Sequence, residues 1–169
     1  SRTDLQLTLP PGAARNAIDC AFWDLEAKRS GKRVADLIGM TPTPLTTAYS
    51  LSLDTPENMA AAATVAAARP LLKIKLGGEG DEERIAAVRA AAPDAKLIID
   101  ANEGWTPDNL IHNIETMARY NVALIEQPLP AGDEEILRSY GSPVPLCADE
   151  SCHDTASLAP LVGLYDAVN

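Results

Sequence analysis

Short apolar runs alternate with longer amphipathic segments along most of the chain. The apolar runs cover residues 46–53, 71–76, 96–100, 122–126 and 144–148, and a sixth begins at Asp166. The segments between them have apolar residues at helical spacing and cover residues 56–68, 81–91, 107–120, 134–139 and 155–161. Continuous apolar strands that alternate with amphipathic helices predict a parallel sheet covered by helices.

The first part of the chain has a different pattern. Residues 13–27 carry apolar side chains at helical spacing, and a Thr-Pro-Thr-Pro stretch at residues 41–44 then interrupts the chain. We therefore expect residues 1–43 to form a helix and a linker, and residues 44–169 to form the strand–helix domain.

Two architectures fit this alternation, an open doubly wound sheet and a (β/α)8 barrel. A doubly wound dinucleotide-binding domain would carry a Gly-x-Gly-x-x-Gly turn after its first strand, which this sequence lacks. Ionisable residues instead recur at the carboxyl ends of successive strands, where barrel enzymes have their active sites. The pattern therefore favours a partial TIM-type barrel, with strands one to five and the start of the sixth.

Three acidic residues end successive apolar runs. Asp100 ends the third run, Glu126 ends the fourth, and Asp149 ends the fifth. Because neighbouring strands lie about 4.8 Å apart, these carboxylates are expected to meet at one edge of the sheet. Three adjacent carboxylates repel one another unless a cation neutralises them, and all-oxygen ligation favours Mg²⁺, with Mn²⁺ as a substitute. For any single acid, the alternative is a solvated loop start or a helix cap.

Lys73 and Lys75 lie on either side of Ile74 in the second apolar run. Side chains alternate along a strand, so both lysines are expected on one face and Ile74 on the other, toward the helices. Two lysines on the interior face of a buried strand need a purpose, because burying an ammonium group is costly. Their mutual repulsion would lower a lysine pKa toward the range that suits a general base. An edge strand with one solvated face is the alternative.

Composition indicates which binding partners are disfavoured and which cellular compartment is expected. The 24 acidic and 14 basic residues leave a net charge of −10, which disfavours nucleic acid and anionic membrane surfaces as partners. No apolar run approaches the length of about 18 residues that indicates a membrane span. Cys20, Cys147 and Cys152 form neither a paired framework nor a Cys-x-x-Cys motif, and Cys20 and Cys147 are expected to be core thiols. A reducing cytoplasm fits this cysteine usage best.

The strand-end residues also carry a family likeness. The chain resembles the enolase superfamily, in its muconate-lactonising subgroup, in four motifs: Lys73-Ile74-Lys75, Asp100-Ala101-Asn102, Glu126-Gln127-Pro128-Leu129 and Ala148-Asp149-Glu150-Ser151. The helix at residues 13–25 and the segments 100–105 and 148–153 resemble, more closely, the dipeptide epimerases that act on L-Ala-D/L-Glu. The likeness covers essentially all 169 residues.

The resemblance implies a role for each residue that matches a family motif. Lys75 would be the base that takes or gives the α-proton on one face of the substrate. Lys73 would help to hold the substrate carboxylate and would tune Lys75. Ser50 and Asn102 would contact the substrate. Asp100, Glu126 and Asp149 would bind Mg²⁺.

The resemblance further implies an isomerase that epimerises dipeptides in murein peptide recycling. Such an enzyme removes the α-proton next to a carboxylate, passes through an enediolate and returns a proton on the opposite face. Another reaction of the superfamily could use the same metal site: a lactonisation by a cycloisomerase, a dehydration or o-succinylbenzoate synthesis. The alternative from a different class is a non-catalytic fragment or binding module that keeps the motifs.

Relatives in this family are longer than the present sequence. They have an N-terminal capping domain, a second catalytic lysine in a Lys-x-Asp-Lys run on the sixth strand, and later strands that hold the ammonium group of a dipeptide. We therefore expect these 169 residues to be part of a longer functional polypeptide. An incomplete barrel leaves strand edges free, so the isolated chain is expected to form homo-oligomers and not to epimerise L-Ala-D/L-Glu.

Overall fold

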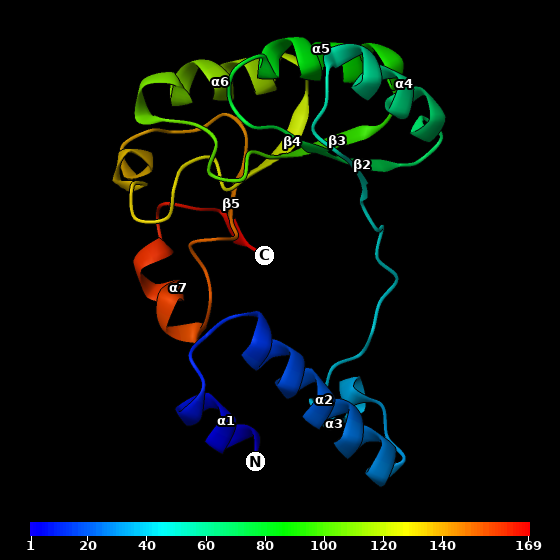
Figure 1. Cartoon of the computed structure of the whole chain (residues 1–169), viewed down its shortest axis with the longest axis vertical. Helices are drawn as coiled ribbons and strands as arrows, with labels where there is room; N and C mark the ends of the chain where they lie inside the picture. The colour runs from blue at the N-terminus through cyan, green and yellow to red at the C-terminus, as the bar shows by residue number, and fades with distance from the viewer. The chain divides into compact units, whose positions relative to one another are not determined.

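In the computed structural model, which describes residues 1–169, the apolar runs form one sheet of six parallel strands (Figure 1). The strands are β1 (Tyr49–Leu51), β2 (Leu71–Lys75), β3 (Lys96–Asp100), β4 (Val122–Glu126), β5 (Leu146–Ala148) and β6 (Ala167–Val168). Each strand pairs in parallel with the next one in the sequence, in the order β1-β2-β3-β4-β5-β6. This order excludes the doubly wound alternative, in which the strand order reverses at a switch point.

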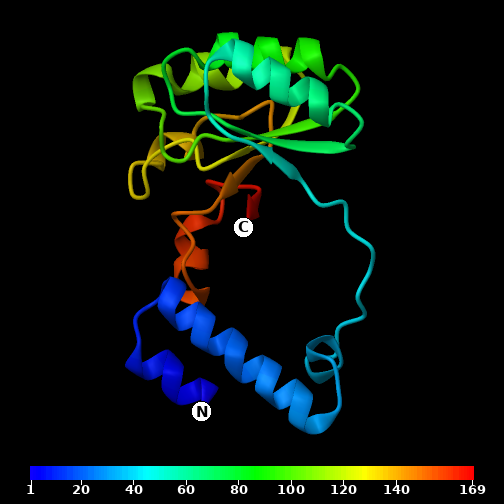
Figure 2. The ribbon, with the colours of Figure 1, turned by 45° about the vertical axis from the view of Figure 1, so that its right-hand side comes forward.

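Helices connect the strands and cover one face of the sheet. They are α4 (Pro56–Ala66), α5 (Asp81–Ala91), α6 (Pro107–Arg119), the 3₁₀ helix η1 (Glu135–Arg138) and α7 (Thr155–Leu161). Figures 1 and 2 show α4, α5 and α6 side by side over the same face of β2, β3 and β4. The helical segments predicted from the sequence are all present, and the shortest of them, between β4 and β5, is a 3₁₀ helix.

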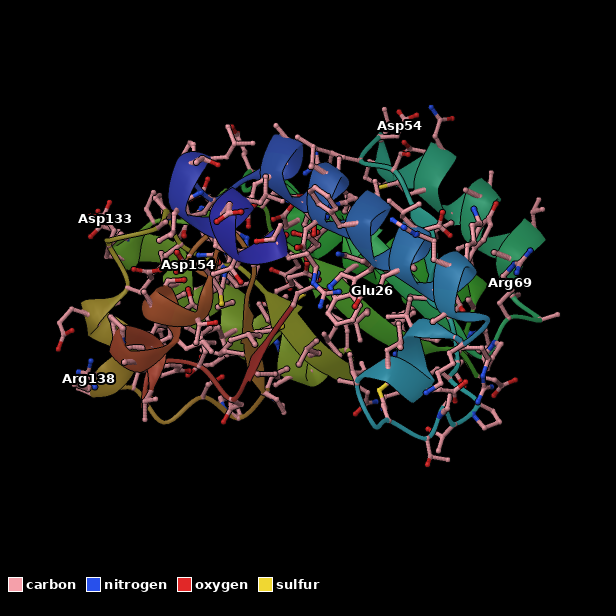
Figure 3. All side chains as sticks on the ribbon, turned by 90° about the horizontal axis from the view of Figure 1, so that it is seen from below. Glu26, Asp54, Arg69, Asp133, Arg138 and Asp154 are labelled. Atoms are coloured by element: carbon pink, nitrogen blue, oxygen red, sulfur yellow. The ribbon has the colours of Figure 1, made fainter.

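Polar side chains cap the helices where the sequence changes from loop to helix. The Thr55 hydroxyl accepts a hydrogen bond from the Asn58 backbone N–H at 3.3 Å, at the start of α4. The Asp154 carboxylate accepts one from the Ser157 N–H at 3.0 Å, at the start of α7. Asp54 and Asp154 lie at these two helix starts (Figure 3). Each cap satisfies a backbone donor that the helix leaves unpaired.

The hydrophobic core lies between the sheet and its covering helices. On three adjacent strands, the same face of the sheet carries fully buried side chains: Ile74, Ile99 and Ile125. Because side chains alternate, the residues next to these isoleucines point to the opposite face. The register pairs Lys75 with Asp100 and Asp100 with Glu126, so the carboxyl ends of β2, β3 and β4 are level.

The chain divides into two compact units, Ser1–Leu45 and Thr46–Asn169. The first unit contains α1 (Arg2–Thr8), α2 (Ala13–Ser30) and α3 (Val34–Leu37). The helix predicted at residues 13–27 is confirmed as α2, whereas α1 and α3 were not predicted. The capping box between Ser1 and Asp4 that begins α1 is a sequence signal for that helix.

The expectation that Cys20 is a core thiol is wrong. Cys20 is exposed on α2, and its apolar neighbours Ile18, Phe22 and Leu25 are also exposed. The other helices of the same unit, α1 and α3, are short and leave these side chains uncovered. Cys147 is buried as expected. None of the helices combines the length and the apolar character needed to cross a membrane.

Arg89, on α5, connects two segments at the amino-terminal end of the sheet. Its guanidinium group donates hydrogen bonds at 2.7–3.4 Å to the backbone carbonyl oxygens of Ala92, Pro93, Ala95, Tyr120 and Asn121. These carbonyls belong to the segment between α5 and β3 and to the turn between α6 and β4. Burial lowers the pKa of Arg89, which is the direction expected for a cation that is removed from water.

Replacing Arg89 by methionine is expected to lower the free energy of unfolding by about 2–3 kcal/mol. The substitution keeps the apolar stem but leaves several carbonyl oxygens without their charged donor. Urea denaturation followed by circular dichroism measures the change. Lys96→Met is the matched control, because Lys96 is an exposed cation at the start of β3. Equal stability of the two variants would contradict this role of Arg89.

Candidate active site

Two lysines and two carboxylates meet at the carboxyl end of the sheet, on the face away from the helices. The Lys73 ammonium nitrogen lies 2.9 Å from Asp100 Oδ2 and 2.7 Å from Glu126 Oε2. The Lys75 Nζ atom lies 2.5 Å from the same Asp100 oxygen. Ile74, between the two lysines, is fully buried on the helix side. The predicted division of faces is confirmed, and β2 is not an edge strand because it pairs with β1 and β3.

The two carboxylate-bearing residues are almost completely buried. Asp100 is 1 % exposed and Glu126 is 3 % exposed. Such carboxylates are tolerated in a protein interior only when cations and hydrogen-bond donors compensate for the lost hydration. Burial acts to raise the pKa of Asp100, but hydrogen bonds from Lys75 and Lys73 outweigh it and lower that pKa. The Asp100 side chain is therefore held as an anion.

The ion pairs of Lys73 with Asp100 and Glu126 determine the protonation of Lys73. Burial acts to lower the pKa of its ammonium group, but hydrogen bonds to Glu126 and Asp100 outweigh burial and raise the pKa. The expectation that repulsion between the lysines lowers the pKa is therefore wrong for Lys73. Two carboxylates lie closer to Lys73 than the sequence pattern alone could indicate.

Asp149 lies in the turn that directly follows β5 and is half-buried. Its pKa is raised, first by burial and then by the negative charges of Glu150, Glu126 and Asp100. Asp149 is thus electrostatically coupled to the two buried carboxylates. However, no three Asp, Glu, His or Cys side chains are grouped closely enough to hold a metal ion as they stand. The three-carboxylate ligand set remains a prediction.

Three features of these residues nevertheless fit a divalent cation. The donors are all carboxylate oxygens, as Mg²⁺ prefers. Two positively charged side chains already lie against Asp100 and Glu126, so this locus favours cations. Next to Asp149, Glu150 has a buried carboxylate oxygen, Oε2, with no hydrogen-bond partner. A buried anion without a partner is costly, and a cation or a water bound to one would satisfy it.

Asn102 connects the lysine side of the site to the Asp149 turn. Its side-chain Oδ1 accepts a hydrogen bond from Lys75 Nζ at 2.9 Å, and its Nδ2 donates to Glu150 Oε1 at 3.0 Å. Its backbone N–H donates to Asp100 Oδ1 at 3.0 Å. Asn102 has a φ of +42°, in the left-handed region that asparagine tolerates better than most residues. The side chain predicted to contact substrate therefore lies at the proposed base.

Ser50 lies in β1, next to the lysine strand. It is exposed and pairs in register with Lys73. Side chains of paired residues extend to the same face of a sheet, so Ser50 is on the side that carries the lysines. Its predicted contact with substrate, like that of Asn102, remains a prediction.

Asp81 is a buried acid that the sequence analysis did not single out. Its carboxylate accepts hydrogen bonds from the backbone N–H groups of Gly77 and Gly78 at 3.1 and 2.8 Å, and from Trp105 Nε1 at 2.9 Å. Gly78 lies so close to the loop after β3 that a Cβ atom there would be 2.9 Å from the Gly104 carbonyl oxygen. Asp81 thus fixes the loops that follow the Lys75 and Asp100 strands. An acid at the start of a helix after a glycine-rich loop is the only signal for it in the sequence.

A second buried polar cluster lies beside Asp149 and was also missed. It contains Gln127, Glu134, Ser151 and Tyr165, which hydrogen bond to one another. Burial and the charge of Glu134 raise the pKa of Tyr165. Gln127 is part of a motif quoted above, but no sequence signal connects it to residues 24 and 38 positions later.

Family models match both units of the chain. Residues 57–167 match the family described as enolase C-terminal domain-like. Residues 2–39 match the family described as the N-terminal domain of mandelate racemase and muconate lactonizing enzyme. The resemblance seen in the four strand-end motifs is thus confirmed.

Curated relatives are similar over the whole chain. The L-Ala-D/L-Glu epimerase of Escherichia coli is 47 % identical over 172 residues, which cover 100 % of this chain and 54 % of the relative. The N-acetyl-D-glutamate racemase of a Pseudoalteromonas species is 47 % identical over 167 residues, which cover 99 % of this chain and 53 % of the relative. The chain therefore spans about half the length of these relatives.

Solved structures show the same similarity in three dimensions. An enolase family member from Agrobacterium tumefaciens with homology to dipeptide epimerases, with bound sodium and L-Ala-L-Glu, is 54 % identical with a TM-score of 0.93; the match covers 100 % of this chain and 52 % of that one. The dipeptide epimerase of Enterococcus faecalis, complexed with Mg and L-Leu-L-Tyr, is 34 % identical with a TM-score of 0.79 and covers 87 % and 44 %. The predicted fold class, a partial barrel, is confirmed.

Proposed function

Because the chain belongs to the enolase C-terminal domain-like family, we propose that it supplies the metal site and one catalytic base of a Mg²⁺-dependent dipeptide epimerase. The observation that carries this proposal is the contact of Lys73 and Lys75 with Asp100, at the carboxyl ends of adjacent strands. That end of a barrel is where its enzymes do their chemistry. The preferred substrate is a dipeptide such as L-Ala-D/L-Glu, on which the Escherichia coli relative acts.

In this proposal Asp100, Glu126 and Asp149 hold the metal ion. A divalent cation there supplies positive charge against a substrate carboxylate whose α-proton is being removed. The protein's contribution is to present the three side chains from the carboxyl ends of successive strands. Asp100 and Glu126 are fixed by paired strands, whereas Asp149 lies in a turn beyond the last paired residue of β5.

Lys75 is the proposed base. In its neutral form it takes the α-proton of the glutamyl residue from one face, and the carbon then becomes planar as an enediolate. Asn102 and Asp100 hold its nitrogen in place. Inversion requires a proton from the opposite face, and Lys73 cannot give it because it extends from the same face of β2 as Lys75. A second base must therefore come from outside β2.

A second substrate class has support of its own. The Pseudoalteromonas relative, an N-acetyl-D-glutamate racemase, is 47 % identical to this chain, as is the dipeptide epimerase. Both substrates are N-acylated glutamates with a free α-carboxylate, and they differ in the ammonium group that only the dipeptide carries. The proposed base and metal ligands act on the shared part. L-Ala-D/L-Glu as the substrate would place the protein in cytoplasmic murein peptide recycling.

Incorporation of deuterium from D₂O tests the proposal. The chain, which spans 54 % of the Escherichia coli epimerase, is completed with the parts of that relative that it does not span. This chimera is incubated with L-Ala-L-Glu, L-Ala-D-Glu or N-acetylglutamate. We expect Mg²⁺-dependent exchange at the glutamate α-carbon, fastest with the dipeptides and abolished by chelation. The isolated chain is expected to show no epimerisation. Absence of exchange with all three compounds in a folded chimera would refute the function.

A further inference from the structure

Gln127 is a completely buried polar residue in the motif that also contains the proposed metal ligand Glu126. Its side-chain oxygen accepts hydrogen bonds from the backbone N–H groups of Asp149 at 2.9 Å and Ser151 at 3.2 Å. Its side-chain nitrogen lies 2.8 Å from Leu129 O, 2.8 Å from Ser151 Oγ and 3.1 Å from Tyr165 OH, so these three acceptors share its two N–H donors. The mechanism described above gives this residue no role.

The surroundings fix the orientation of the Gln127 amide. Two backbone donors face its oxygen, so the NH₂ group must face the opposite side. On that side Ser151 Oγ and Tyr165 OH accept from Gln127 and donate to the Glu134 carboxylate. Glu134 is itself 5 % exposed and accepts from the Gly132 N–H at 2.6 Å. A chain of donors and acceptors with one consistent direction allows only one orientation of the amide.

Backbone pairing with β6 continues to Ala148, but pairing with β4 stops before the Asp149 turn. β5 has three residues, and only Leu146 and Cys147 pair with β4. Asp149 lies two residues beyond the last of these pairs. The hydrogen bonds of Gln127 to Asp149 and Ser151 therefore replace the missing backbone pairs between the end of β4 and the turn.

We propose that Gln127 is a positioning residue that holds the Asp149 turn against the end of β4 and so sets the affinity of the site for Mg²⁺. The inference rests on the proposed role of Asp149 as a metal ligand. Gln127 follows Glu126 directly, so one strand end would carry one ligand and orient another from the neighbouring strand. Gln127 also has a φ of +35°, a strained backbone conformation of the kind that occurs at functional sites. Residues that orient metal ligands typically change metal affinity 10–100-fold when they are replaced.

Calorimetric titration of the 169-residue chain with MgCl₂ tests the inference on four variants. Gln127→Met keeps the length of the side chain but removes every hydrogen bond of the side-chain amide. Gln127→Asn keeps the amide but is one methylene too short to reach both N–H groups. Each is expected to weaken Mg²⁺ binding about 10–100-fold. Tyr165→Phe removes one acceptor of the same cluster but keeps both hydrogen bonds from the backbone of the Asp149 turn to the Gln127 oxygen, and should bind Mg²⁺ as the parent does.

The fourth variant, Asp149→Asn, separates the role of Asp149 as a metal ligand from the positioning role of Gln127. If Asp149→Asn keeps the parent's affinity, Asp149 is no ligand and the proposed metal site itself is wrong. If it loses affinity while folded Gln127→Met and Gln127→Asn keep theirs, the metal site stands and the positioning role is overturned. Should Gln127→Met not fold, as judged by circular dichroism, the milder Gln127→Asn decides. Equal losses in Tyr165→Phe and Gln127→Asn would assign the effect to the whole cluster and overturn the role of Gln127.

Discussion

Replacing Glu126 by glutamine is expected to weaken Mg²⁺ binding about 100-fold or more. Glu126 is 3 % exposed, and its Oε2 atom lies 2.7 Å from Lys73 Nζ. The substitution keeps the size of the side chain but removes a negative charge from a site that must attract a cation. Losing one partner of a buried ionic group costs about 3–5 kcal/mol, and about 2.8 kcal/mol corresponds to 100-fold in affinity. Calorimetric titration with MgCl₂ measures the change.

Glu115→Gln provides the matched control for this experiment. Glu115 is exposed on α6, so the substitution changes the net charge equally but leaves the strand ends intact. We expect its Mg²⁺ affinity to equal that of the parent. If Glu126→Gln also binds Mg²⁺ as well as the parent, the assignment of Glu126 as a ligand is wrong. If both variants lose affinity equally, the binding reflects the overall negative charge of the protein.

The features that could be predicted from the sequence all depend on local periodicity. The buried strands are continuous apolar runs that end in a charged residue, and β2, β3 and β4 begin and end within one residue of the predicted positions. The pairing of Lys75 with Asp100 follows from two such runs in unshifted register. The pairing of Asp100 with Glu126 also depends on a register shift between Leu97 and Ile99, which the apolar pattern does not indicate. The two lysines on one face are a consequence of the same alternation.

What could not be predicted depends on contacts between distant segments. The buried amide of Gln127 reaches Ser151 and Tyr165, 24 and 38 residues later, and no periodic pattern encodes such hydrogen bonds. The pKa of Lys73 was expected in the wrong direction because the sequence shows the neighbouring lysine but not the distance to either carboxylate. The exposed position of Cys20 was missed because an apolar stripe on a helix does not say what covers it.

Replacing Lys75 by alanine is expected to abolish α-proton exchange with one epimer of the substrate. In the proposed mechanism each face of the α-carbon is served by its own base, so removing Lys75 disables proton transfer on one face only. General-base catalysis contributes about 10²–10⁴-fold to rate, and a loss of this size is expected for that epimer. The measurement is deuterium incorporation from D₂O into L-Ala-L-Glu and L-Ala-D-Glu, followed separately by NMR in the chimera that carries a complete barrel.

Two further lysine variants make the result specific to Lys75. Lys96→Ala, at the opposite end of the sheet, should leave exchange with both epimers unchanged because Lys96 is exposed and distant along β3 from Asp100. Lys73→Ala should raise KM and lower kcat together, since Lys73 contacts both buried carboxylates and is proposed to hold the substrate carboxylate. Exchange with both epimers at the parent's rate in Lys75→Ala would remove Lys75 from the mechanism.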